Sequence, residues 1–183
     1  MHLPSRFRSA AVVSAIIAVS ALAHAGLSKP SESNVKFTAS GPAGLKVEGT
    51  TSALDLAEDA GNVVLTVHLT GLDTGISVRD KHTKDCLEVD KYPDAKLTVS
   101  RAALKLPASG DKASADAPAT LTLHGKTLPT SVHYDVKADG GALVVDGKLR
   151  VNINDAGMTA PSYLGVTVKP DVDVEVHFRV SGS

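Results

Sequence analysis

Short segments in which apolar and polar residues alternate run through most of the chain after residue 34. Alternation with a period of two is typical of half-buried β-strands, because successive side chains of a strand point to opposite faces of the sheet. In the clearest segments, residues 63–70 and 172–180, Val, Leu or Phe occupies every second position. Further strands are expected at residues 35–39, 45–56, 97–99, 119–123, 132–136 and 143–153.

Turn-forming residues separate these segments at short intervals, which excludes the long crossovers that parallel strands require. Asp139-Gly140-Gly141 predicts a hairpin, because glycine adopts positive φ without steric cost. Gly147 interrupts the apolar alternation of its segment and indicates a bulge or a bend. Residues 107–118 are polar and contain Gly, Pro, Ser and Asp, so they are expected to form a loop.

Eight antiparallel strands can close into a barrel whose interior is filled by side chains or holds one small ligand. The inward positions are mainly Val, Leu and Ala, and aromatic residues make up only 3% of the chain, so few large side chains are available to fill a lumen. The pattern therefore predicts an all-β fold, an eight-stranded antiparallel barrel with an apolar cavity. A solid sandwich core is the alternative that the pattern leaves open.

The first 25 residues have the composition of an export signal. Arg6 and Arg8 precede an apolar run over residues 10–23, and Ala23-His24-Ala25 is a small-x-small cleavage site. An uncleaved membrane anchor is the alternative, but the run is shorter than the about 20 apolar residues of a spanning helix. We expect a signal peptide at residues 1–25, a flexible lead-in at 26–34, one barrel domain at 35–183, no stable membrane span after cleavage, and a periplasmic or secreted location.

Charge and cysteine content narrow the function further. The formal net charge is −1, and nucleic-acid binding requires a basic footprint, so nucleic acid is not expected as a partner. Cys86 is the single cysteine of the chain, so no internal disulfide can form. The fold must therefore be stabilised by its apolar core.

One dense run of charge interrupts the strands between residues 71 and 93. Residues 78–89 are the one segment after the signal peptide that suits a short helix, with Arg79, His82 and Cys86 roughly on one face. Such a cluster at the mouth of a barrel would meet the polar end of a ligand. A solvated helix that only covers the barrel end is the simpler alternative, because charge runs usually face water.

The sequence around this helix resembles the central signature of the YceI-like family, in which a Thr-Gly run and Arg-Asp-x-His precede Lys-Tyr-Pro and a strand. Thr74, Arg79-Asp80, His82 and Lys91-Tyr92-Pro93 stand in register with that signature. Residues 119–129 (ATLTLHGKTLP) are similar to a second family motif, G-x-L-T-L/I-x-G-x-T-x-P. A weaker third likeness covers residues 152–168, so the resemblance extends over essentially the whole chain after the signal peptide.

This resemblance implies an eight-stranded lipocalin-like barrel with a short helix between strands, exported to the periplasm. It also implies an elongated apolar cavity that holds a polyisoprenoid or a similar long-chain amphiphile, such as a quinone-like lipid. The expected activity is binding or transport without chemical turnover, and no cofactor or metal is expected. Whether the protein forms a homodimer is left open at this point.

Contacts with the polar end of the guest are expected from the signature residues. Arg79 is the first choice, since a guanidinium binds phosphate-like oxygens bidentately, and a structural pair with Asp80 or Asp85 is the equal alternative. His82 would donate to the same head group or bond the helix to the barrel, and Tyr92 is expected to pack at the barrel rim. The candidate ligand-binding residues are Arg79, Asp80, His82, Tyr92 and His124.

Two other kinds of function are weaker hypotheses. A redox-linked or enzymatic role would use Cys86 and His82, but the chain has no nucleophile elbow and no phosphate-binding glycine loop. A metal site would require several convergent imidazoles or thiolates, and the histidines are scattered along the strands. A structural or stress-protective envelope protein with a filled core is the third hypothesis.

Overall fold

The structure is a computed structural model that describes residues 30–108, 110–163 and 166–181. The predicted signal peptide and the first part of the predicted lead-in lie outside these residues. The first strand begins at Ser31 rather than at Val35, so part of the segment expected to be a flexible lead-in belongs to the sheet.

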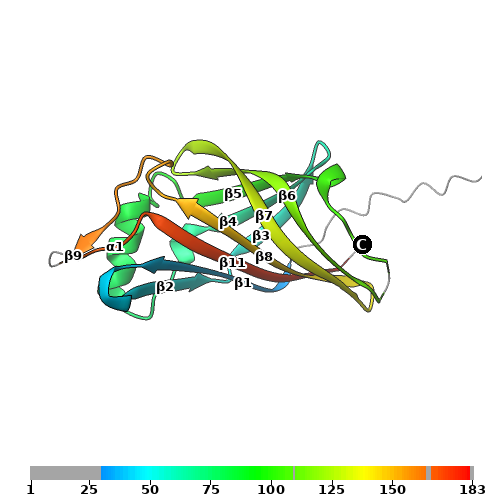
Figure 1. The fold of residues 1–183 in the computed structure, drawn as a ribbon, viewed down its shortest axis with the longest axis horizontal. Helices are drawn as coiled ribbons and strands as arrows, with labels where there is room; N and C mark the ends of the chain where they lie inside the picture. Colours follow the sequence, from blue (N-terminus) through cyan, green and yellow to red (C-terminus); the bar gives the residue numbers. More distant parts are fainter. Residues whose placement is uncertain (1–29, 109, 164–165, 182–183) are drawn as a thin grey trace, which may run out of the picture.

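The described chain is mainly β-structure with one α-helix (Figure 1). The helix α1 (Ser77–Leu87) confirms the short helix expected at residues 78–89. Three short 3-10 turns are η1 (Pro42–Gly44), η2 (Leu69–Gly71) and η3 (Arg101–Ala103). The strands are β1 (Ser31–Ser40), β2 (Lys46–Thr51), β3 (Leu54–Asp59), β4 (Asn62–His68), β5 (Asp94–Ser100), β6 (Lys112–Leu123), β7 (Lys126–Asp139), β8 (Ala142–Asn152), β9 (Ser162–Tyr163), β10 (Val166–Thr167) and β11 (Asp171–Ser181).

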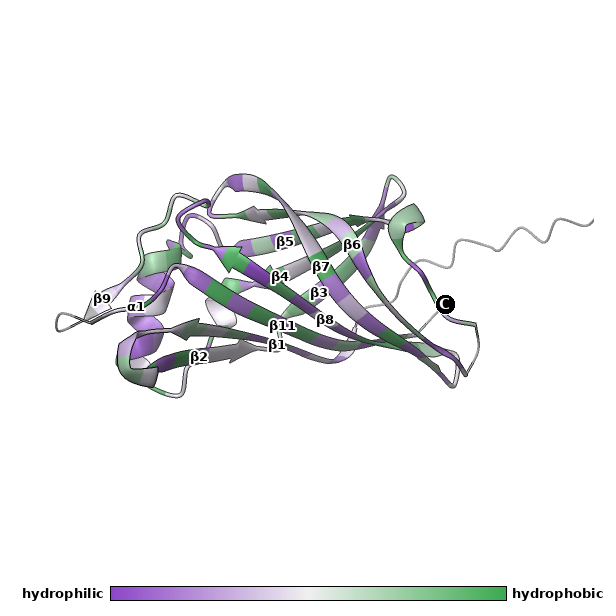
Figure 2. Cartoon of the chain, viewed as in Figure 1, coloured by the Kyte–Doolittle hydropathy of each residue, from purple (hydrophilic) through white to green (hydrophobic). Residues whose placement is uncertain are grey.

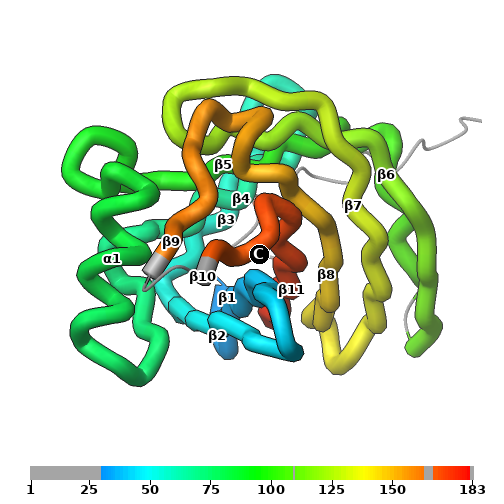
Figure 3. Tube along the Cα trace, turned by 60° about the vertical axis from the view of Figure 1, so that its left-hand side comes forward, coloured from blue at the N-terminus to red at the C-terminus, as the bar shows by residue number. Residues whose placement is uncertain are grey.

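A single antiparallel sheet forms the wall of the molecule, in the order β2-β1-β11-β8-β7-β6-β5-β4-β3, and β9 and β10 form a separate ribbon. The sheet curls around the core as a lipocalin-like barrel wall (Figures 1 and 3). Its two edge strands, β2 and β3, are consecutive in the chain and are separated only by Ser52 and Ala53. β2 pairs with β1 and β3 pairs with β4, so one bent segment supplies both edges.

This bend explains why the main sheet has nine strands and not the expected eight. Residues 45–56 were expected to form one strand, but the chain changes its pairing partner after Thr51. There the Ala53 amide donates to Thr51 Oγ1 at 3.1 Å, and the Ser33 hydroxyl donates to the Ser52 carbonyl at 2.7 Å. These bonds fix the bend where the two edges of the sheet come together.

One sequence expectation about the strands is wrong, and of the bulge or bend expected at Gly147 the bulge is absent. Most of residues 107–118 are not a loop, because β6 begins at Lys112 and pairs with β7 from that residue onwards. The inward positions there are alanines, of which Ala117 is fully buried, so their small side chains gave little apolar signal. Gly147 does not form a bulge, because the ladders pair it with Tyr134 on one side and Val176 on the other without a shift in register.

The apolar positions of the predicted strands face the interior. Figure 2 shows hydrophobic and hydrophilic residues alternating along the long strands. Alternate apolar residues of β8 and β11, among them Val145 and Phe178, pack in the core. One core cluster lies beneath α1 and includes Leu69, Val89 and Met158. Two others, around Phe178 and Tyr134, lie further along the barrel interior. The expected inward face is therefore confirmed, and it is built mainly from Val, Leu and Ala.

The insertion between β4 and β5 covers one end of the barrel. It contains η2 and α1, and its two ends are joined where the Leu69 amide donates to the Pro93 carbonyl at 2.7 Å. Residues 101–108, called the strap below, follow β5 at the opposite end (Figure 1). Within the described residues, no helix has the length and apolar character needed to cross a bilayer.

Candidate functional site

Two apolar cavities lie in series inside the barrel. The helix-end cavity, beneath α1, has a volume of about 210 Å³, and the strap-end cavity has a volume of about 90 Å³. Leu65, Leu97, Leu149 and Val176, from four different strands, line both cavities. The cavities are therefore neighbouring compartments of one elongated interior and share part of their lining.

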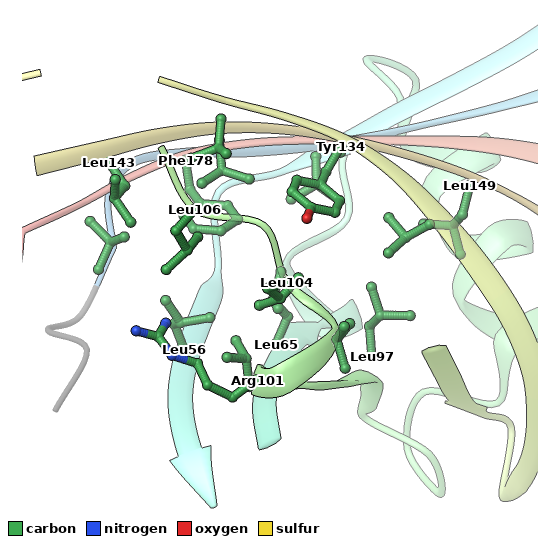
Figure 4. Close-up of a pocket in the computed structure, with 18 residues that line it drawn as sticks. Leu56, Leu65, Leu97, Arg101, Leu104, Leu106, Tyr134, Leu143, Leu149 and Phe178 are labelled. Atoms are coloured by element: carbon green, nitrogen blue, oxygen red, sulfur yellow. The ribbon is translucent and has the colours of Figure 1, made fainter. Parts of the chain in front are cut away.

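The two cavities differ in the few polar side chains that reach them. Thr83 and Cys86 of α1 are the polar residues that line the helix-end cavity, and its other lining residues are apolar. The strap-end cavity is lined by Arg101 and Tyr134 in addition to apolar residues (Figure 4). An interior of this kind offers apolar contact along its length and polar contact only near its ends.

The predicted residues at the start of α1 form a compact hydrogen-bonded cluster. Asp80 Oδ1 accepts hydrogen bonds of 2.6 Å from both the amide and the hydroxyl of Thr74, which is buried. Arg79 donates to the Thr74 carbonyl through Nη2. The bonds from Thr74 hold the pKa of Asp80 below its usual range, with smaller contributions from Lys84 and Arg79. This cluster fastens the loop before α1 onto the first turns of the helix.

Tyr92 and His124 meet at the same end of the barrel. Their ring centroids are 4.5 Å apart, and Lys91 Nζ lies 4.8 Å from the centre of the Tyr92 ring. His124 Nε2 is 3.4 Å from Glu88 Oε2, next to the C-terminus of α1. The contact packs the β6–β7 turn against the segment that follows the helix, as expected for a Tyr92 at the barrel rim.

None of the five candidate residues is among those that line the two cavities. The α1 side chains that do reach the helix-end cavity are Thr83, Cys86 and Leu87. The spacing of Thr83 and Leu87, four residues apart on a helix, was the signal in the sequence for a second, cavity-facing side. Arg101 was missed, because a lone arginine after a strand has no distinguishing pattern. The five residues remain candidates only for contacts outside the cavities.

Cys86 is poorly suited to redox chemistry. Its Sγ contacts the Thr159 carbonyl at 3.6 Å, which joins α1 to the segment between β8 and β9. Burial raises the pKa of the thiol, so the reactive thiolate is disfavoured. Across the part of the chain that the structure describes, no group of three or more His, Cys, Asp or Glu residues is placed to hold a metal ion.

A histidine between two carboxylates anchors the α1 insertion to the barrel wall. His68, the last residue of β4, is 2.7 Å from Asp94 Oδ1 through Nδ1 and 3.0 Å from Asp55 Oδ2 through Nε2. Hydrogen bonds with Asp55 and Asp94 raise the pKa of His68. Because His68 directly precedes the insertion and Asp94 directly follows it, this histidine joins the two ends of the segment.

The raised pKa of His68 predicts a pH-dependent contribution to stability. A group whose pKa is higher in the folded state stabilises fully below its unfolded pKa, about 6.5 for histidine, and this contribution is lost as pH rises through the folded pKa. We expect His68→Gln to lower the Tm most at about pH 5.5 and progressively less at alkaline pH. The measurement is thermal unfolding, followed by circular dichroism, over the pH range from about 5.5 to alkaline values.

The control for this prediction is His177→Gln, because His177 has a single close carboxylate, Asp146, at 2.7 Å. Its effect on the Tm should be smaller, because only one carboxylate contact is lost. Equal Tm losses for the two variants at every pH would show that the double carboxylate contact of His68 has no special role.

Comparisons with known proteins agree with this architecture. Residues 28–180 match the YceI-like domain family. A protein of Pseudomonas savastanoi pv. phaseolicola named UPF0312 protein is 32% identical over 136 residues, which cover 70% of this chain and 68% of that protein. A UPF0312 protein of Pseudomonas syringae pv. tomato gives the same identity and coverage.

Solved structures with this fold have lower sequence identity. A polyisoprenoid binding domain from Saccharophagus degradans superimposes with a TM-score of 0.69 at 22% identity, over 86% of this chain and 98% of that one. Burkholderia cenocepacia BcnA gives a TM-score of 0.63 at 19% identity, over 80% and 95% of the two chains. At these identities the likeness shows the fold alone. The family match over most of the sequence, with relatives above 30% identity, shows that the chain belongs to the YceI-like family.

Proposed function

We propose that this protein binds a polyisoprenoid or a similar long-chain amphiphile inside its barrel and carries it without chemical turnover. The observation that carries the proposal is the pair of apolar cavities in series, which share four lining residues. A narrow apolar interior of this shape suits a long, flexible hydrocarbon better than a compact ligand. The solved relative described as a polyisoprenoid binding domain supports the same class of guest.

The size of the helix-end cavity favours an occupied state. Protein interiors are close-packed, and they contain few voids larger than a water molecule. An apolar space of about 210 Å³ therefore loses dispersion contacts along its whole lining when it is empty. Water would find few hydrogen-bond partners there. A hydrocarbon chain would restore the contacts, and its burial would contribute about 0.8 kcal/mol for each methylene group.

The predicted signal peptide would export the protein, to the periplasm or out of the cell. There a carrier would shield an apolar molecule from water. The signature residues Arg79, Asp80, His82, Tyr92 and His124 would support this role at the helix end, by holding the α1 insertion over the helix-end cavity.

Native mass spectrometry of the protein from the exported fraction tests the proposal, followed by organic extraction and titration with the C20 alcohol geranylgeraniol. We expect a discrete added mass that extracts as a long-chain isoprenoid, and uptake of geranylgeraniol by delipidated protein. A ligand-free mass together with no uptake of geranylgeraniol would contradict the proposal and favour the structural role.

A pair of variants on β8 provides the matched control. Leu149 lines both cavities, whereas Val144 is on the opposite face of the same strand. Leu149→Gln places an unpaired amide in the apolar interior and should weaken uptake by about tenfold or more. Val144→Gln should leave uptake unchanged. Equal uptake by both variants, with both folded, would place the guest outside the barrel.

A further inference from the structure

We infer that Arg101, at the strap end of the barrel, binds the anionic head group of the carried amphiphile, and that the hydrocarbon tail runs from there towards α1. This inference rests on the proposed function and assigns the head group to the end opposite the signature residues. The head group is defined by its anionic oxygens, which either a phosphate or a carboxylate would supply.

The charges around the cavities carry the inference. Among the described residues that line either cavity, Arg101 is the one with a charged side chain. Among the described residues, the polar groups that line the helix-end cavity are a hydroxyl and a thiol, and neither neutralises an anion. At the helix end, Arg79 is engaged by the Thr74 carbonyl, lies beside Asp80 and lines neither cavity.

The position of Arg101 suits a group that joins an apolar channel to water. Its amide donates to the Gly61 carbonyl at 2.9 Å, so its backbone is fixed to the β3–β4 turn. Figure 4 shows its side chain running past Leu56, with the guanidinium at the edge of the pocket. The aliphatic stem can therefore contact the first carbons of a bound chain while the guanidinium stays in water, as long cationic side chains do elsewhere.

The guanidinium has donors available for a ligand. Its nearest described anionic partner is Glu58, with Nη1 and Oε1 3.7 Å apart, which is too long for a hydrogen bond. The side chain is 45% exposed, and a planar guanidinium has five N–H donors. A phosphate or carboxylate arriving at the pocket edge could therefore receive a bidentate contact without first breaking a short ion pair.

The strap next to Arg101 forms the rim of the same pocket. Leu104 and Leu106 line the strap-end cavity, and the side chain of Leu106 is partly exposed. The Tyr134 hydroxyl accepts a 2.6 Å hydrogen bond from the Lys105 amide and holds the strap over the pocket. A tail that enters beneath Leu106 would pass between Leu104 and Tyr134 and reach the four side chains shared with the helix-end cavity.

The test is isothermal titration calorimetry with three ligands that share one C20 tail: geranylgeranyl phosphate, geranylgeranic acid and the neutral geranylgeraniol. In wild type we expect the anionic ligands to bind more tightly than the alcohol. Arg101→Gln should weaken the anionic ligands by about tenfold and leave geranylgeraniol within about twofold. Arg101→Lys should restore part of the loss, because it returns the charge without the bidentate geometry.

Arg150→Gln is the matched control, because it removes the same charge from an exposed position on the outer face, where Arg150 pairs with Asp173. It should change none of the three affinities. Equal losses for all three ligands in Arg101→Gln, or a loss of anion affinity in Arg79→Gln but not in Arg101→Gln, would overturn the assignment. Failure of wild type to bind any of the three ligands would instead contradict the proposed function itself. A loss confined to the phosphate or to the acid identifies which anion the site prefers.

Discussion

Replacing Gly147 with leucine is expected to weaken isoprenoid binding by about tenfold or more while the protein stays folded. Gly147 is buried on β8 and lines the strap-end cavity. A Cβ there would lie 3.8 Å from Val132 Cγ2 and 4.0 Å from Val176 Cβ, which are ordinary contact distances. The rest of a leucine side chain would extend into the cavity, and excluding only two methylene groups of a ligand costs about 1.6 kcal/mol, or more than tenfold in affinity.

Gly147→Ala separates the blocked channel from damage to the strand. Its methyl group has room and leaves the cavity largely open, so geranylgeraniol should bind as in wild type. Its Tm should rise slightly, because replacing glycine at a compatible position typically stabilises by about 0.4–1 kcal/mol through the unfolded state. Titration with geranylgeraniol and thermal unfolding are the measurements. Wild-type affinity in folded Gly147→Leu would mean that the guest does not occupy the strap end.

Replacing Gly125 with alanine is expected to destabilise the protein by about 2–4 kcal/mol, through backbone strain and a steric clash together. Gly125 has a φ of +71° in the β6–β7 turn, and a Cβ there would lie 2.7 Å from Tyr92 Cε1. The Tyr92 ring packs against His124, so moving it would disturb the contact between this turn and the segment after α1. Urea unfolding of the variant and wild type gives the change directly.

Gly140→Ala isolates the strain from the clash. Gly140 is also a hairpin glycine, with a φ of +58°, but a Cβ there would meet nothing within 4 Å. This variant should lose only the about 1–2 kcal/mol of a left-handed backbone. If the two variants lose the same stability, the contact between Gly125 and Tyr92 contributes nothing, and Tyr92 is free to adapt.

The sequence predicted the fold best where large apolar side chains alternate with polar ones. β4, β8 and β11 follow this pattern and were found at the expected positions. The first half of β6 was missed, because its inward residues are Ala113, Ala115 and Ala117, which are too small to stand out from a polar loop. The bend after Thr51 was missed because pairing partners depend on the closure of the whole sheet, which no local pattern records.

The candidate site was harder to predict than the fold for a physical reason. The charged residues of α1 attract attention in a sequence, but on a short helix they bond to nearby backbone or face water, as Arg79 and Asp80 show. The side chains that line the interior, such as Leu97 and Leu149, have the same apolar character as residues of a filled core. Whether such residues enclose a cavity depends on the shape of the closed wall, and only the structure shows that.

The bent segment formed by β2 and β3 also affects the tendency of this protein to self-associate. An open sheet presents free amide and carbonyl groups along its outermost strands, and these groups can template the addition of another chain. Here both outermost strands are only six residues long and converge at Ser52 and Ala53. Self-association by strand addition is therefore disfavoured. The edges of this sheet, which encloses an apolar interior, are not expected to seed fibrils even in a concentrated protein solution.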